Sequence, residues 1–426
     1  MRKFLAFLTV AYIGSQAFDS VLRWVLNMAH ADPAIYLRDV DLIAITVLCL
    51  FKIIVEGKDI TRVVFLLVAF AGLGCASLCS GLGVAQTAFG VKLWLPLIAG
   101  ALLVEADIAP QLDLPKLWAA LWAAVCAGIF INYFVVYPWS GLLVDVGDVA
   151  ISANREWTAG GVRRLSGFSR SSFDGAVIVL VLFIYLLNRW KGVVSRIGLA
   201  VISAAAIGLT TAKGAAAALM FCVVLAPLLN SVRSNFSALR VPLLASLLAV
   251  AAIGLIIPAV SEQLPFPRLQ VGSVSYWIFA SFVERAQTTW PHAFDLLSSY
   301  WQWLTGRGIG GIGAAQLRFE PNVYSPADSL FIYLFVTAGL LGALFYVYLA
   351  LASLRLQLGV VHHRMVFMFV CSCVTYGLTM NVIESAVFAM ALGAATSFLA
   401  MQASLSAVTT TGKGSSREYP VLRQPA

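Results

Sequence analysis

Three arginines lie close together in a polar stretch that separates two long apolar runs. Arg163, Arg164 and Arg170 fall within residues 157–175, which read WTAGGVRRLSGFSRSSFDG. A guanidinium group stays protonated at every relevant pH and matches two phosphate oxygens at once. Exposed loop charges, or contacts with anionic lipid headgroups, would produce the same pattern. Because an apolar run begins directly after the cluster, we expect these arginines to bind the anionic group of a substrate at a membrane surface.

A lysine and two further arginines extend this set of candidate anion ligands. Lys213 lies in the LTTAKG sequence between two apolar runs, and Arg285 and Arg307 lie in a later polar stretch. A lysine beside an apolar run also reaches the membrane surface simply because its side chain is long. We nevertheless expect Lys213 to be a second cation for the same anion.

Three side chains are candidates for accepting a proton from an attacking hydroxyl group. Such a group is a histidine or a carboxylate in most enzymes. His292 and Glu284 lie in the later polar stretch, and Asp328 directly precedes an apolar run. An exposed loop histidine, or a carboxylate that caps a helix, would look the same in the sequence.

The composition indicates that lipid surrounds much of this chain. Only 11% of the 426 residues are charged and 61% are hydrophobic, whereas a soluble domain has about 25% charged residues. The net charge of +8 fits the excess of Lys and Arg on the cytoplasmic side of membrane proteins. No basic run is dense enough to predict a nucleic-acid partner. The seven cysteines lie in apolar runs without the spacing of a metal site, so we expect them to be small buried side chains.

Twelve segments are apolar for about the length of a membrane-spanning helix. The sequence therefore predicts an all-α, polytopic membrane domain over residues 1–408, followed by a polar, disordered cytoplasmic tail over 409–426. The predicted spans are 4–21, 40–55, 63–80, 85–104, 117–136, 174–190, 197–209, 215–229, 241–260, 329–351, 365–380 and 382–401.

Two long polar loops, 137–173 and 261–328, separate predicted spans. The short loops carry more Lys and Arg on the inside when both termini are cytoplasmic, and this orientation puts both long loops outside. Loops of this length are usually functional or disordered. The later loop is rich in aromatic residues, and the spacing between Ser275 and Trp303 permits helices that lie at the membrane interface. These rings are interpreted either as an aromatic belt among headgroups or as a platform on which sugar rings stack.

A glycine-rich stretch and one lysine within a predicted span also have a pattern that could be functional. Gly308 to Gly313 match G-x-G-x-x-G, but no strand or βαβ unit surrounds them, so we do not predict a dinucleotide site. Lys92 falls within a predicted span, where an ionisable residue is either functional or paired with a carboxylate such as Asp19.

Taken with the span pattern, four stretches resemble the O-antigen polymerase/ligase superfamily. Arg164 and Gly175 match the arginine–glycine motif of its external loop, and Lys213 falls where members carry a cation after a Ser/Thr-rich segment. Ala327 and Asp328 stand near where ligases tend to carry a His-Asn pair, and this departure favours a polymerase. The four stretches are RRLSGFSRSSFDG, LTTAKGAAAAL, LTGRGIGGIG and ADSLFIYLFVTAGLLGALFY.

The resemblance implies an inverting, GT-C-like glycosyltransferase of the bacterial inner membrane that needs neither metal nor cofactor. It would join undecaprenyl-diphosphate-linked repeat units in exopolysaccharide or O-antigen assembly, with the bilayer, a flippase and a chain-length regulator as partners. The alternatives are a ligase that transfers polymer to the lipid A core and a transporter of lipid-linked glycans. The implied diphosphate ligands are Arg163, Arg164, Arg170, Lys213, Arg285 and Arg307, and the implied bases are His292, Glu284 and Asp328.

Overall fold

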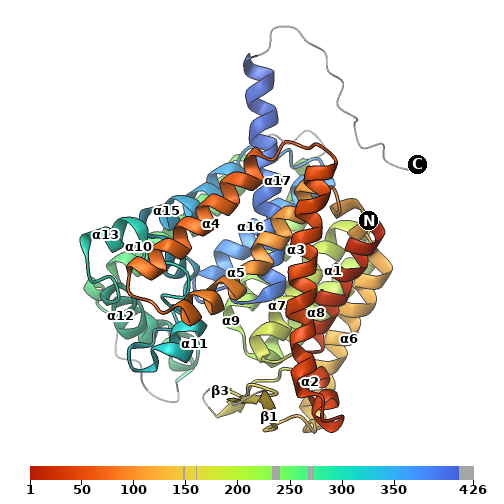
Figure 1. Cartoon of the computed structure of the whole chain (residues 1–426). Coiled ribbons are helices and arrows are strands. Elements are labelled where there is room, and N and C mark those ends of the chain that lie inside the picture. The colour runs from red at the N-terminus through yellow and green to blue at the C-terminus, as the bar shows by residue number, and fades with distance from the viewer. Residues whose placement is uncertain (147–148, 160, 233–239, 267–269, 271–272, 412–426) are drawn as a thin grey trace.

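The protein is a bundle of α-helices, and helices cover most of each segment expected to span the membrane (Figure 1). The computed structural model describes all residues except 147–148, 160, 233–239, 267–269, 271–272 and 412–426. The helices of the bundle are α1 (Arg2–Ala17), α2 (Asp19–Met28), α3 (Leu37–Val55), α4 (Thr61–Cys79), α5 (Val84–Glu105), α6 (Pro115–Phe134), α7 (Ser172–Arg189), α8 (Val193–Thr210), α9 (Lys213–Val232), α10 (Arg240–Val260), α15 (Leu330–Ser353), α16 (Val361–Gly377) and α17 (Ala386–Thr411).

The lengths of these helices support a multi-pass membrane protein. Eight helices of the described chain are long and apolar enough to cross a membrane, and α1 and α2, which meet at 83°, make a ninth if they count as one span. Helices α3, α9 and α16 cover the other expected spans. Helix α17 continues to Thr411, and residues 412–426 of the expected tail lie outside the described residues.

Both long loops contain regular structure. The first has two antiparallel strand pairs, β1 (Leu143–Val146) with β2 (Val149–Ser152) and β3 (Thr158–Ala159) with β4 (Val162–Arg163). The later loop is largely helical, as expected between Ser275 and Trp303, and contains η4 (Ser261–Gln263), α11 (Val274–Glu284), the π-helical turn η5 (Arg285–Thr289), α12 (Trp290–Asp295), α13 (Tyr300–Thr305), α14 (Ala314–Phe319) and η6 (Pro321–Val323).

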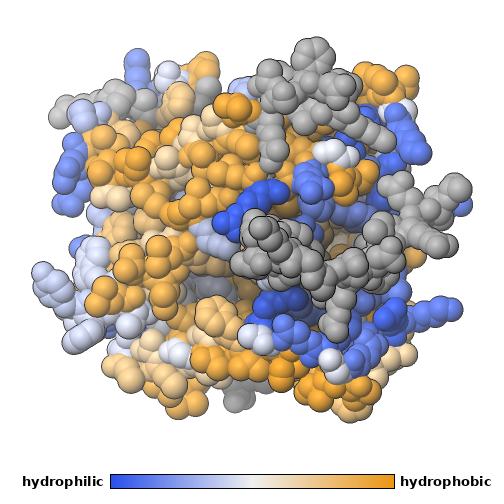
Figure 2. Space-filling view, turned by 90° about the horizontal axis from the view of Figure 1, so that it is seen from above, coloured by the Kyte–Doolittle hydropathy of each residue, from blue (hydrophilic) through white to orange (hydrophobic). Residues whose placement is uncertain are grey.

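The two loops lie at different places on the molecule. The strands of the first loop lie with α2 at the end away from the last turns of α17, whereas α11, α12 and α13 of the later loop lie along one side, below and beside α10 (Figure 1). Viewed from the α17 end, apolar residues cover much of one side, and hydrophilic residues gather toward the other (Figure 2). Many large apolar side chains on α3, α4, α8 and α10 are exposed, which suits a lipid environment.

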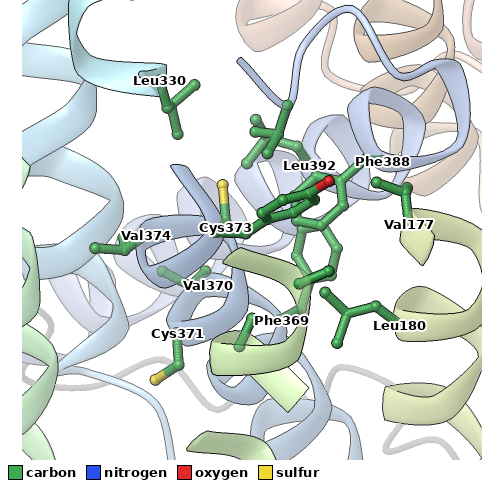
Figure 3. Packing of buried hydrophobic residues seen from close by; sticks show 14 of the residues in the cluster. Val177, Leu180, Leu330, Phe369, Val370, Cys371, Cys373, Val374, Phe388 and Leu392 are labelled. Carbon is green, nitrogen blue, oxygen red and sulfur yellow. The ribbon is translucent and has the colours of Figure 1, made fainter. Parts of the chain in front are cut away.

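Helix α16 lies at the centre of the hydrophobic core. Its Phe369 is buried and packs against Phe388 of α17 (Figure 3). Five cysteines are also buried, but Cys75 and Cys79 on α4 are exposed. The expectation that all seven are buried is therefore wrong for these two. Helix α4 packs less against the bundle than the other seven candidate spans do, since only 11% of its most apolar 18 residues are buried.

Glycines bring α5 and α17 into close contact. A Cβ atom added at Gly393 would collide with the backbone oxygen of Leu97, and one added at Gly100 would collide with the backbone oxygen of Met390. Lipid tails are as apolar as the helix surfaces, so helices in a membrane associate largely through close van der Waals packing. This pair of glycines therefore fixes how closely the two helices approach.

Candidate functional site

The loop that carries the arginine motif is tied to the end of α8 and to the start of α7. The backbone N–H of Leu165 donates to the oxygen of Leu209 (3.3 Å). Ser171 caps α7, because its hydroxyl accepts from the N–H of Asp174 (3.1 Å) and donates to the Asp174 carboxylate (2.7 Å). Reciprocal bonds of this kind fix a helix start. Arg164 directly precedes Leu165, and its guanidinium lies over the ring of Phe173 at 5.2 Å.

The same tie places Lys213 near Arg164. Helix α8 ends at Thr211 in the left-handed region (φ 55°), and α9 begins two residues later at Lys213. Lys213 is close enough to Arg164 and Arg285 to feel the charges of both. A Cβ added at Gly214 would meet the ring of Tyr376, so the start of α9 packs directly on α16.

The third cation comes from the later loop. The Nε of Arg285 donates to Oδ2 of Asp328 at 2.9 Å, and its Nη1 donates to the oxygen of Ser281 at 3.2 Å. Ala327 and Asp328 both have positive φ, at 64° and 35°. Two consecutive non-glycine residues in this region are strained, and such strain is concentrated at functional sites.

We call Arg164, Lys213, Arg285 and Asp328 the cation cluster. Three cations and one carboxylate give it a net charge of +2. Burial, and then the positive charge of Arg285, lower the pKa of Arg164, while Asp328 acts in the opposite direction. The structure records no hydrogen-bond partner, within its described residues, for three buried atoms here: Nε of Arg164, Oγ1 of Thr211 and the hydroxyl of Tyr376. Unsatisfied donors around excess positive charge are suited to an anion with several oxygens.

A partly buried carboxylate that the sequence analysis did not include in the site lies nearby. Glu384 is in the segment between α16 and α17, and its Oε1 accepts from the N–H of Ala314 at 2.7 Å. Burial raises the pKa of Glu384 to about 7, and the negative charge of Asp328 acts in the same direction. A carboxyl group with such a pKa exchanges protons near neutral pH.

The other two arginines of the motif lie elsewhere. Arg163 pairs with Glu156 (3.0 Å) and donates to the hydroxyl of Ser140 (3.1 Å). Arg170 lies in a second group of charges, which we call the N-terminal network, with Arg23, Arg38, Arg155, Asp19 and Asp174.

The N-terminal network connects the motif loop to α2. Asp19 pairs with Arg23 (3.0 Å) and Arg38 (2.7 Å), and Ser20 donates to the oxygen of Ser169 (2.9 Å). Burial, and then Arg155 and Arg23, lower the pKa of Arg170 to about 9. This network holds the loop in position.

Lys92 has a partner other than the expected one. It binds Asp39 at 2.6 Å, because Asp19 is already paired with Arg23 and Arg38.

Arg307 belongs to the glycine-rich loop. It pairs with Glu320 (3.0 Å) and donates to the backbone oxygen of Gly311 (2.7 Å). These contacts stabilise the conformation of the loop, and Arg307 is not part of the cation cluster. Gly308 and Gly310 have φ of 83° and 87° and pack against the backbones of Ser77 and Gln86. The loop thus docks against α4 and α5.

The remaining two base candidates are exposed. His292 lies on α12 and Glu284 at the end of α11. In the part of the chain that the structure describes, no recorded side-chain contact joins either of them to the cation cluster. The structure therefore brings together four of the nine candidate residues: Arg164, Lys213, Arg285 and Asp328.

Comparison with protein-family models, curated proteins and solved structures finds no match. The described residues also contain no group of three or more His, Cys, Asp or Glu side chains arranged to hold a metal ion.

Proposed function

We propose that this protein is a glycosyltransferase that joins undecaprenyl-diphosphate-linked repeat units at the outer face of a bacterial inner membrane. The proposal includes twelve spans, a GT-C-like arrangement and cytoplasmic termini. The observation that carries it is the convergence of Arg164, Lys213 and Arg285 from three distant segments. Two of these residues match motifs of the O-antigen polymerase/ligase superfamily.

The cation cluster would bind the diphosphate of the donor. As the bond between the sugar C1 and the diphosphate oxygen breaks, negative charge grows on that oxygen. Fixed cations in a partly buried site stabilise this charge without having to reorganise. Arg164 and Arg285 supply forked donors, and Lys213 supplies a compact charge.

The acceptor hydroxyl attacks C1 from the opposite face, which inverts that centre. Its oxygen forms the new bond to C1, and its proton must go to a nearby base. Glu384 suits this step because its pKa of about 7 lets it take a proton at neutral pH. Asp328 is paired with Arg285 and is proposed to position that arginine.

The test compares two adjacent arginines in purified protein reconstituted with a defined lipid-linked repeat unit. Arg164→Ala removes a member of the cluster and should lower turnover by about 100-fold. Arg163→Ala removes a surface pair with Glu156 and should change it little. Equal polymer formation by Arg164→Ala and the wild type would contradict the proposal.

A deletion strain separates the polymerase from the alternative ligase. Loss of a polymerase leaves single lipid-linked repeat units, whereas loss of a ligase leaves lipid-linked polymer that is not attached to the core. The departure from the His-Asn pair of ligases at Ala327 and Asp328 favours the first outcome. The flippase and chain-length regulator remain proposed partners.

A further inference from the structure

A cavity of about 390 Å³ opens beside the last turn of α10, next to η4, α12 and α13. Its volume lies within the range typical of small-molecule sites. Four side chains with distinct chemistry line it: Glu262, Phe294, Asp295 and Trp303. None of them belongs to the cation cluster, the N-terminal network or the glycine-rich loop.

One wall of the cavity is aromatic and held in a fixed orientation. The rings of Phe294 and Trp303 are nearly parallel, with centroids 6.1 Å apart and planes at 5°. Phe335 of α15 packs edge-on to both, at 5.9 Å from Phe294 and 5.6 Å from Trp303. Trp303 nevertheless remains 46% exposed. A rigid aromatic side chain with exposed surface can pack against the apolar C–H face of a sugar ring at little entropic cost.

The rest of the polar lining is acidic. Glu262 and Asp295 are exposed, and the structure records no hydrogen bond or ion pair for either side chain with a described residue. Ionised carboxylates only accept hydrogen bonds, so they suit hydroxyl groups. The same two charges repel carboxylate and phosphate groups.

We infer that this cavity binds a sugar unit that bears no acidic group, within the glycan of the lipid-linked substrate. The inference rests on the proposed function. Arg285 and Asp295 are connected by continuous η5 and α12, and ten residues of helix span about 15 Å. A short oligosaccharide whose diphosphate lies at Arg285 therefore reaches the cavity. The two carboxylates select against uronic acids at this position in the repeat unit.

Binding of free sugars tests the inference without any need for turnover. The purified full-length protein is titrated by calorimetry with maltotriose, mannotriose, chitotriose and trigalacturonic acid. At least one uncharged trisaccharide should bind saturably, and the acidic one should bind at least about tenfold more weakly than the best of them. Failure of all three uncharged sugars, or equal binding of the acidic one, would overturn the inference.

Matched variants locate the binding. Trp303→Ala should weaken binding by about tenfold, whereas Trp301→Ala should not, because Trp301 lies on the same short helix, is 75% exposed and does not line the cavity. A Glu262→Gln/Asp295→Asn double variant changes only exposed groups, so it tests the inference even if Trp303→Ala misfolds. The double variant should reduce the difference in affinity between the uncharged trisaccharides and the acidic one. An unchanged difference would overturn the role of the carboxylates.

One further variant separates this inference from the proposed function. Arg164→Ala should lower turnover by about 100-fold and leave the binding of free trisaccharides unchanged. If Arg164→Ala turns over like the wild type while the sugars bind, the proposed function is wrong and the cavity is still a sugar-binding site. If turnover is lost and no uncharged sugar binds to the wild type, the cavity inference fails alone.

Discussion

Arg285 and Asp328 are 43 positions apart in the chain, yet the Nε of one lies 2.9 Å from the Oδ2 of the other. The pair joins the π-helical turn η5 to the start of α15, and Arg285 is close enough to Arg164 for its charge to lower the pKa of Arg164. Both side chains are partly exposed, at 18% and 28%. The pair is therefore better understood as a device that positions a cation than as a large source of stability.

The first prediction concerns that pair. Asp328→Asn keeps the size of the side chain but removes its charge, so Arg285 loses its fixed orientation. We expect turnover to fall by about tenfold or more, while the free energy of unfolding falls by about 1 kcal/mol. Turnover with the lipid-linked repeat unit and thermal unfolding in detergent measure the two effects. Glu156→Gln, which breaks the more exposed pair with Arg163, is the control and should leave turnover unchanged. Wild-type turnover in Asp328→Asn would show that the pair positions nothing needed for catalysis.

The second prediction concerns the glycine-rich loop. Gly308 has φ of 83°, and a Cβ atom there would collide with the backbone of Ser77. Gly81 has almost the same φ, 82°, with no atom within 4 Å of an added Cβ. Alanine at either site suffers the strain of positive φ, about 1 kcal/mol or more, but only Gly308→Ala also displaces the loop from α4. We expect thermal unfolding to show a greater loss of stability for Gly308→Ala than for Gly81→Ala. Equal losses would contradict the close contact between the glycine-rich loop and α4.

The third prediction tests the close approach of α5 and α17. Gly393→Ala places a methyl group against the backbone of Leu97, and we expect it to lower the free energy of unfolding by about 1 to 3 kcal/mol. Gly74→Ala on α4 meets open space and should be neutral or stabilising, since alanine favours helix more than glycine does. Thermal unfolding of the two variants in the same detergent gives the comparison. A neutral Gly393→Ala would mean that the helices are free to move apart.

The twelve expected helical segments were predictable because each is an apolar run of nearly membrane length. The strand pairs of the first long loop were not predicted. They span only two to four residues each, between Leu143 and Arg163, and such short strands lack a readable alternation of apolar and polar residues.

The site could be predicted only in part, for physical reasons that the chain shows. Arg164 and Arg170 look equivalent in the sequence, but Gly167 has a φ of 63° and packs against the backbone of α6. The chain turns there, and the two arginines enter different groups of charges. Sequence spacing alone does not show such a turn.

Glu384 was missed for a different reason. The apolar stretch 382–401 was interpreted as one span, which would place Glu384 inside the membrane. The structure ends α16 at Gly377 and begins α17 only at Ala386, so Glu384 lies in the break between them. There it faces the N–H of Ala314 from the later loop, a contact between positions 70 apart.

The fourth prediction follows from the pKa of Glu384, which is raised from its ordinary value of 4.5 to about 7, chiefly by burial. The folded protein therefore holds a proton on this group more tightly than the unfolded chain does. The resulting contribution to stability is complete below about pH 4.5 and is lost as the pH rises through about 7. Glu384→Gln has no such proton, so the stability of the wild type relative to this variant should fall over that range.

Turnover should show the opposite dependence on pH. A base must be ionised to accept a proton, so the rate should rise as the pH increases through about 7, where Glu384 loses its proton. Glu384→Gln should lose this rise and at least about 100-fold in rate. Unfolding and turnover measured between pH 4 and 9 on both proteins give the two profiles. If the rate of Glu384→Gln rises through pH 7 as steeply as the wild-type rate does, the base is another residue, because this variant has no carboxyl group to titrate at position 384.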